Sequence, residues 1–174
     1  MSEANEYVRS HPALQALAAE AHHVDVVGVA GDAELRPFLA ATFSYTPWWL
    51  RLLYGLRRGL ARIMGLQHAG PPARPHYTAQ DVPFVPGEQF TFVSVVAAEE
   101  NAYWIATAGD KHLDGYIAVL RRPDDPRGPR MLLATLVRYK HWTGRLYFAL
   151  ILPFHFLIVH AMARHAKEHA ATEA

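Results

Sequence analysis

The chain has 174 residues, of which 19% are charged and 51% are hydrophobic, a composition typical of one globular domain with a sizeable core. Its formal net charge is +1 with neutral histidines, so no strong basic field favours nucleic acid and no acidic field favours cations. It contains no cysteine, which excludes disulfides, thiol catalysis and cysteine-ligated zinc. We therefore expect a single domain over residues 1–174 with no nucleic-acid partner.

The N-terminal stretch MSEANEYVRSHPALQAL is polar and lacks the basic-then-apolar order of a signal peptide, so cytoplasmic residence is the default expectation. The first predicted element is a short strand, Val24–Ala30, because its residues are mostly apolar and β-branched. Asp32 follows as the predicted N-cap of a helix that runs toward Phe43. A second helix is predicted from an N-cap, a first-turn proline and a glycine stop, namely Thr46, Pro47 and Gly65.

The proline- and glycine-rich segment LQHAGPPARPHYTAQDVPFVPGE is predicted to be a long ordered loop. Beyond it, strand-like runs on short turns predict a four-stranded antiparallel meander. The predicted strands are Phe90–Ala97, Ala102–Ala108, Leu113–Leu120 and Met131–Lys140. A long helix from about Arg145 to Ala166 follows, and it is the only large apolar element left to cover the sheet. The fold class is therefore α+β, with a curved antiparallel sheet wrapped around a long C-terminal helix.

The last helix is apolar enough to be tested as a membrane span. Its apolar run, Leu146–Val159, is interrupted only by Pro153 and His155 and reaches about 21 Å at a rise of about 1.5 Å per residue. A hydrocarbon core is about 30 Å thick, and a histidine near its centre is costly. We therefore expect no membrane span and a helix buried in protein. Pro153 predicts that this helix kinks or begins afresh, with one backbone carbonyl left without its usual donor.

Three motifs carry a resemblance to a known family: DKHLD at Asp110–Asp114, TLVRYKHWTGRLYF at Thr135–Phe148 and PFHFLIV at Pro153–Val159. With the order of the elements, they resemble the helix-grip fold of the SRPBCC superfamily, which includes START and birch-pollen-allergen-like proteins. The match is closest to an uncharacterised bacterial family with a domain of unknown function, found alone or fused behind NAD(P)-binding Rossmann domains. The resemblance covers nearly the whole chain.

This resemblance implies an internal cavity, because the wider superfamily includes lipid and hormone carriers, polyketide cyclases and oxygenase domains. It leaves the chemistry open. Two positions depart from the family pattern: Gly115 stands where an aromatic residue is usual, and Phe156 stands where a basic residue is usual. Both changes are expected to alter the cavity or its rim.

Tyr147 and His155 are the first candidates for polar contacts to a ligand. They are eight residues apart, which places them on roughly one face of a helix. A second interpretation of His155 is structural, with its neutral imidazole satisfying a carbonyl freed by Pro153.

Trp104, Tyr116 and Arg138 are candidates for the sheet side of the cavity. Their faces are not determined by the sequence, because a slip of one residue in register reverses each assignment. Trp104 is favoured as a core residue over a site residue. Arg138 is either an exposed rung of a strand or a clamp for a carboxylate.

Two histidine motifs have ordinary explanations. His165 and His169 in HAKEH match a zinc-protease pattern, but they lie in a C-terminal tail that we expect to be frayed and metal-free. Asp110, His112 and Asp114 lie at a predicted hairpin, where polar residues are expected and a cross-strand pair explains them. We therefore predict no catalytic residue, no metal and no cofactor.

The sequence predicts a binding module for a hydrophobic small molecule, such as a lipid, polyketide or isoprenoid. One alternative is a cyclase- or isomerase-type enzyme that uses the same cavity. A second is a peripheral membrane or partner-docking protein, because Arg51, Arg58 and Arg62 follow one face of the second predicted helix. A homodimer is left open.

Overall fold

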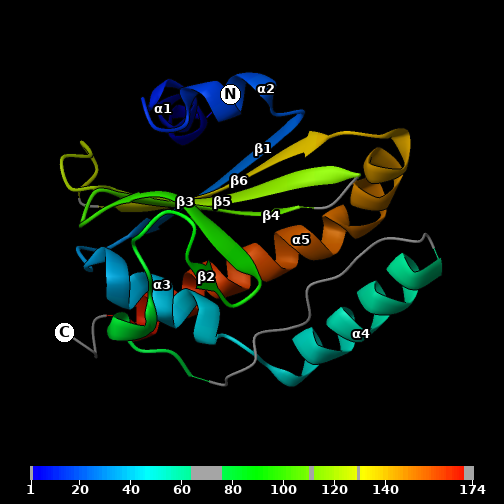
Figure 1. The fold of residues 1–174 in the computed structure, drawn as a ribbon. Helices are drawn as coiled ribbons and strands as arrows, with labels where there is room; N and C mark the ends of the chain where they lie inside the picture. Colours follow the sequence, from blue (N-terminus) through cyan, green and yellow to red (C-terminus); the bar gives the residue numbers. More distant parts are fainter. Residues whose placement is uncertain (1, 64–75, 110–111, 129, 171–174) are drawn as a thin grey trace.

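The computed structural model describes residues 2–63, 76–109, 112–128 and 130–170, and its elements are shown in Figure 1. The helices are α1 (Glu3–Ser10), α2 (Gln15–Glu20), α3 (Leu35–Ser44), α4 (Trp48–Ile63), the short 3-10 helix η1 (Ala79–Asp81) and α5 (Trp142–His169). The strands are β1 (His23–Ala30), β2 (Gln89–Phe90), β3 (Val93–Glu99), β4 (Tyr103–Gly109), β5 (Leu113–Arg122) and β6 (Arg130–Tyr139).

The strands form one six-stranded antiparallel sheet in the order β1-β6-β5-β4-β3-β2, which is not closed. The predicted meander is confirmed, and β1 extends it by pairing with β6, with Val27 opposite Leu133. The first predicted meander strand is in fact two strands, because the chain reverses at Thr91, which has a φ of 55°. Helix α5 packs on one face of the sheet, and α1 and α2 lie on the other (Figure 1). The predicted α+β fold is thereby confirmed.

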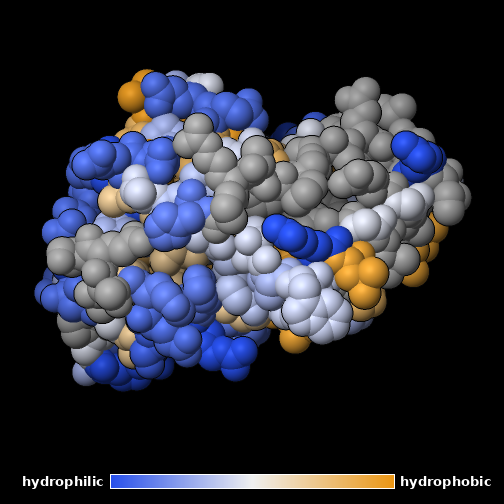
Figure 2. Space-filling model, turned by 90° about the horizontal axis from the view of Figure 1, so that it is seen from below, coloured by the Kyte–Doolittle hydropathy of each residue, from blue (hydrophilic) through white to orange (hydrophobic). Residues whose placement is uncertain are grey.

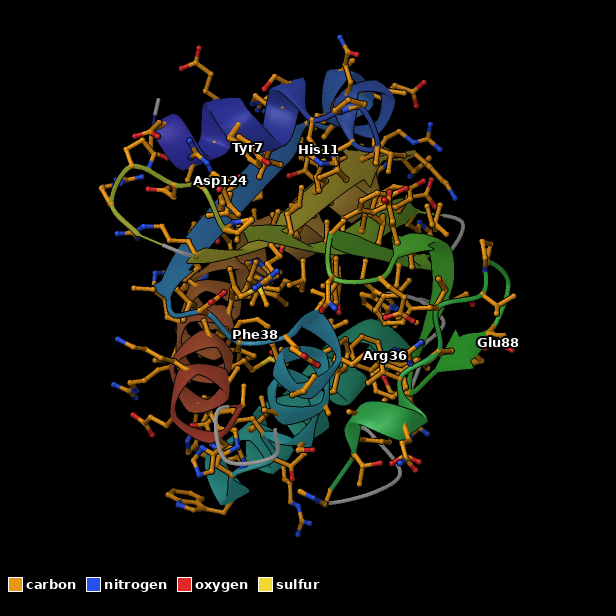
Figure 3. The ribbon with its side chains drawn as sticks, turned by 90° about the vertical axis from the view of Figure 1, so that its left-hand side faces the viewer. Tyr7, His11, Arg36, Phe38, Glu88 and Asp124 are labelled. Atoms are coloured by element: carbon orange, nitrogen blue, oxygen red, sulfur yellow. The ribbon has the colours of Figure 1, made fainter. Side chains whose placement is uncertain are left out.

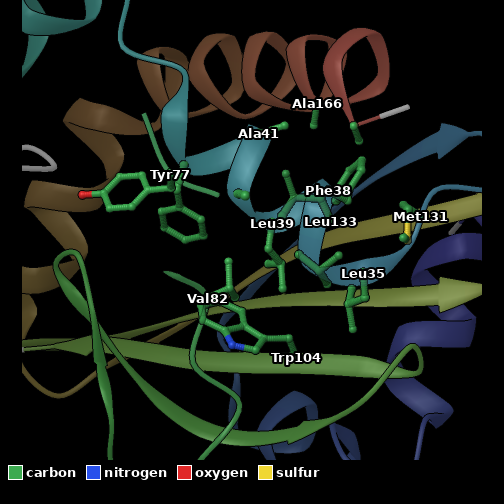
Figure 4. Packing of buried hydrophobic residues seen from close by; sticks show 14 of the residues in the cluster. Leu35, Phe38, Leu39, Ala41, Tyr77, Val82, Trp104, Met131, Leu133 and Ala166 are labelled. Carbon is green, nitrogen blue, oxygen red and sulfur yellow. The ribbon is translucent and has the colours of Figure 1, made fainter. Parts of the chain in front are cut away.

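The two faces of the sheet carry two separate hydrophobic clusters, because side chains alternate along each strand. In β6, Met131 and Leu133 belong to the cluster on the α3 and α5 side, whereas Leu132 and Leu136 belong to the cluster on the α1 and α2 side. Figure 4 shows the first cluster, with Trp104 from the sheet below side chains from α3 and α5. Figure 3 shows the sheet between the two layers, with Tyr7 and His11 on one side and Phe38 on the other.

Helices α1 and α2 were missed by the sequence analysis, which noted only the polar character of this segment. Both helices are short and offer few local sequence signals. Ser2 caps α1 by accepting from the backbone N–H of Asn5 at 3.3 Å, and Val8 is the one buried residue of α1. Arg122 of β5 fastens α1 to the sheet, with Nη1 3.2 Å from Glu3 Oε1 and its guanidinium 4.5 Å from the Tyr7 ring centroid. Tertiary contacts of this kind stabilise helices too short to persist alone.

Helices α3 and α4 are present, but their starts differ in detail from the prediction. Asp32 is not the N-cap of α3, because the helix begins at Leu35 and Asp32 instead pairs with Arg121 at 2.5 Å. Pro47 lies just before α4, and its carbonyl accepts from the backbone N–H groups of two residues in the first turn. The predicted stop at Gly65 and part of the predicted long loop lie outside the described residues.

Helix α5 continues without a break from Trp142 to His169, so the prediction that it begins afresh at Pro153 is wrong. Proline lacks an N–H, so the carbonyl of Ala149 has no donor from the ordinary helical position. The tail is not frayed at HAKEH: the His165 ring lies 4.9 Å from that of Tyr45 and 4.0 Å from that of His169.

Within the described part of the chain, α5 is the one helix whose length and composition would suffice to cross a membrane. It packs against α3, α4, β1 and β6 through its inner face. Only 28% of its most apolar 18-residue stretch is buried. The expectation of a fully buried helix is therefore wrong for its outer face.

Candidate ligand cavity between the sheet and helix α5

A cavity of about 250 Å³ lies between α5 and the face of the sheet that α5 covers. Its wall comes from α3, the turn between β2 and β3, the strands β4 to β6, and α5. The apolar lining side chains include Phe43, Phe92, Leu113, Ile117, Leu133, Val137, Phe148, Leu150, Ile151, Phe154, Ile158, Val159 and Met162. Polar side chains are few, with Thr42, Thr135, Tyr147 and His155 among them.

Small residues on the sheet leave room for this cavity. Ala108 of β4 and Gly115 of β5 are directly opposite each other, and both line the cavity. Gly115 has no side chain, so it leaves the sheet backbone exposed to the cavity at this point. An added Cβ there would lie 3.1 Å from the Ala108 carbonyl oxygen, which is a tight contact. An aromatic side chain at this position would project from the same face of β5 into the space that is now open.

Tyr147 and His155 both lie in the cavity wall, on the inner face of α5. Tyr147 is buried and His155 is half-buried. The His155 ring centroid lies 5.9 Å from that of Phe148, which places the imidazole among aromatic side chains. The structure therefore brings the two helix candidates together at one cavity, and their contact with a ligand stays a prediction.

Of the three candidates on the sheet, only Tyr116 borders the cavity. Its side chain packs against the cluster on the α1 and α2 side, so its backbone is the part that faces the cavity. Trp104 is fully buried in the other cluster and donates its indole N–H to the Pro83 carbonyl oxygen at 2.8 Å. Arg138 pairs with Glu20 and with Asp114. Trp104 and Arg138 are therefore core and surface residues and not cavity residues.

The described polar side chains of the DKHLD segment are explained by contacts with the neighbouring strand and with the start of α5. Asp114 lies 2.7 Å from Arg138 Nη2 and 2.5 Å from Lys140 Nζ, which together hold the pKa of this carboxyl below its ordinary value against the opposing effect of burial. His112 Nδ1 lies 2.7 Å from the Thr143 hydroxyl at the start of α5. Asp110 lies outside the described residues.

The sequence analysis missed two polar residues beside the cavity, His23 and Asp25. They are directly opposite the cavity residues Val137 and Thr135 on β6, and therefore lie on the same face of the sheet. His23 Nε2 and Asp25 Oδ2 are buried and make no hydrogen bond to any other described residue. The signal was the alternation of HVDVV, which places both side chains on the face of β1 that also carries Val27.

Burial lowers the pKa of His23 from its ordinary value of 6.5, and the nearby Asp25 opposes that shift. The ring lies 5.0 Å from Phe148 and 6.2 Å from Phe156, so the surroundings favour the neutral imidazole. A folded-state pKa below the unfolded one means that the unfolded chain binds the proton more tightly. The stability that depends on neutral His23 is therefore complete above pH 6.5 and is lost as the pH falls below it.

We expect the urea concentration at the unfolding midpoint of the wild-type protein to decrease as the pH is lowered from about 8 to about 5. His23→Leu should reduce this dependence without abolishing it, because burial also lowers the pKa values of His11 and His165. Urea denaturation at a series of pH values measures the change. An identical pH profile for the variant would contradict the prediction.

The class of protein defined by these features is an α+β domain with an open antiparallel sheet, a long C-terminal helix and an apolar cavity between them. Residues 15–162, well over half of the chain, match the model of a family described as "Protein of unknown function (DUF2867)". The chain belongs to this family. No curated protein and no solved structure matches the chain.

Proposed function

We propose that this protein binds a small hydrophobic molecule in the cavity between α5 and the sheet, and that its fold is the helix-grip fold of the SRPBCC superfamily. The observation that carries the proposal is the cavity itself, with a volume of about 250 Å³ and a mainly apolar lining. Protein interiors are close-packed and contain few voids larger than one water molecule, which occupies about 30 Å³ in the liquid. A cavity of this size is therefore more than a packing defect.

The size and lining indicate the chemistry of the ligand. Pockets for small molecules commonly measure about 300–1,000 Å³, so this cavity of about 250 Å³ lies just below that range and suits a small ligand. Burial of apolar ligand surface would supply the affinity, at about 25 cal/mol per Å² before the costs of association. Tyr147 and His155 in the wall, with Asp25 and His23 beside it, would orient a polar end of the ligand.

A substitution that fills the cavity tests the proposal. Ile117 lines the cavity from β5, and Ile117→Trp would place a larger side chain in it. We expect this variant to lose affinity for the apolar fluorophore 1-anilinonaphthalene-8-sulfonate by about tenfold or more, because the probe and the indole would compete for one volume. Native mass spectrometry of the purified wild type identifies any ligand that is retained.

The matched control is Leu157→Trp, on the outer face of α5, where the side chain is exposed and does not line the cavity. It should leave the affinity unchanged. Equal probe affinity in wild type and Ile117→Trp, with the same melting temperature, would contradict binding in this cavity.

Tyr147→Phe tests the polar end of the site, because it keeps the ring and removes only the hydroxyl. We expect a loss of about 0.5–1.5 kcal/mol in the binding free energy of a ligand that contacts the hydroxyl. Titration of the retained ligand into wild type, Tyr147→Phe and His155→Leu measures the loss. Unchanged affinity in both variants would remove these two residues from the site.

A further inference from the structure

The outer face of the first half of α5 is apolar and open to solvent. Five large side chains recur along it at spacings of three or four residues, and each is between 40% and 68% exposed: Trp142, Leu146, Leu150, Phe154 and Leu157. This spacing aligns them on one side of a helix. The resulting stripe, called here the α5 stripe, is about 24 Å long at about 1.5 Å per residue. Scattered exposed apolar residues are normal, but a continuous patch marks an interaction site.

The stripe ends sharply at Leu157. Farther along α5 the exposed residues are polar: His160, Arg164, Lys167, Glu168 and His169. One helix thus has two outer surfaces, apolar in its first half and polar in its second. A soluble helix that only covers a sheet needs a polar outer face along its whole length, so the apolar half requires a partner.

The segments that form α4 and most of α5 contain basic residues and no carboxylate. From Trp142 to Lys167 the sequence contains no Asp or Glu, and neither does the segment between Glu34 and Asp81, which includes α4. Helix α4 contains four arginines, and the described side chains of Arg51 and Arg62 are exposed.

Helix α4 contacts α5 and adds apolar surface of its own. Trp48 and Leu52 in its first half are 78% and 68% exposed. Figure 2 shows some hydrophobic atoms on the side of the molecule where α4 lies, while the opposite end is mostly hydrophilic.

A lipid bilayer with anionic headgroups matches this combination better than a second copy of the chain. Two copies joined through the α5 stripe would bring two segments together that each contain Arg145 and no carboxylate to pair with it. An anionic bilayer offers negative headgroups for the arginines and an apolar layer for the stripe. Tryptophans such as Trp48 and Trp142 favour the boundary between the two.

The stripe is also continuous with the cavity. Leu150 and Phe154 are exposed on the outer surface and line the cavity as well, so the cavity reaches the surface at the stripe. We propose that the first half of α5, assisted by α4, docks the protein on an anionic lipid surface. Docking in this way would set the opening of the cavity against the lipid, a consequence that rests on the proposed function.

Vesicle binding tests the docking. We expect the full chain to sediment with phosphatidylcholine vesicles that contain phosphatidylglycerol, and to do so less at high salt, because the arginine contribution is screened. Its tryptophan fluorescence should shift to shorter wavelength on binding. Arg51→Glu with Arg62→Glu should weaken the binding by roughly fivefold per charge and reduce its dependence on salt.

The stripe itself is tested by the double variant Leu146→Asn and Leu157→Asn. Both side chains are exposed and neither lines the cavity, so folding and probe binding should persist. Vesicle affinity should fall roughly tenfold or more, because two leucine side chains no longer enter the apolar layer. Val85→Asn is the matched control, since Val85 is 57% exposed and lies between η1 and β2, far along the chain from both helices.

Three results would overturn the docking. The first is no binding of the wild type to anionic vesicles at low salt, and the second is vesicle binding by the double variant equal to that of the wild type. The third is a dimer of the wild type in solution that is absent in the double variant. The last result would assign the stripe to a second copy. Failure of probe binding with vesicle binding intact would refute the cavity function alone. Failure of vesicle binding with probe binding intact would refute the docking alone.

Discussion

We expect Trp104→Ala to lower the free energy of unfolding by about 3–5 kcal/mol, which is a large part of the stability of a typical domain. Trp104 is fully buried, and its ring packs edge-on against Phe43 at 5.8 Å and Phe90 at 6.2 Å between centroids. Alanine would leave a cavity at the junction of the sheet and α3. It would also deprive the Pro83 carbonyl of its 2.8 Å hydrogen bond from the indole.

Trp104→Phe separates these two contributions, because it keeps an aromatic ring and removes the indole N–H. We expect it to be less destabilising than alanine. Urea denaturation followed by circular dichroism gives both values. Because Trp104 does not line the cavity, probe affinity of the folded protein should persist in both variants. A loss below about 1 kcal/mol for Trp104→Ala would contradict its place in the core.

We expect Gly144→Ala to destabilise the protein by about 1–3 kcal/mol or more, although alanine is the better helix former. Gly144 lies buried in the first turn of α5, and an added Cβ would lie 2.3 Å from the His112 carbonyl oxygen and 2.9 Å from its carbon. That oxygen already accepts from the backbone N–H groups of Lys140 and His141, at 2.9 Å and 3.1 Å. The contact is with backbone, so no side chain can rotate away.

Gly55→Ala is the matched control, because Gly55 lies within α4, is exposed and has nothing within 4 Å of an added Cβ. There we expect a gain of about 0.5–1 kcal/mol from helix propensity. Thermal or urea unfolding of both variants measures the difference. A stabilising Gly144→Ala would show that the start of α5 does not approach the β4–β5 hairpin this closely.

The sequence by itself determined the parts of the structure that depend on local pattern. The strands of the meander follow from alternation and turn residues, and α5 follows from a long apolar run after Lys140. The placement of Tyr147 and His155 in one wall follows from helical spacing, because eight residues separate them on the same helix. These inferences needed no knowledge of what packs against each element.

The tertiary structure decided which face of each element is covered. Trp104, Tyr116 and Arg138 lie on adjacent strands, yet they belong to the core, to the opposite face and to a surface ion pair, because the register of each strand assigns its side chains to one face or the other. His23 and Asp25 lie beside the cavity residues Val137 and Thr135 only because β1 pairs with β6, more than a hundred residues away in sequence. The same holds for the outer face of α5: its composition predicts burial, but the sheet is open and covers only one side of the helix.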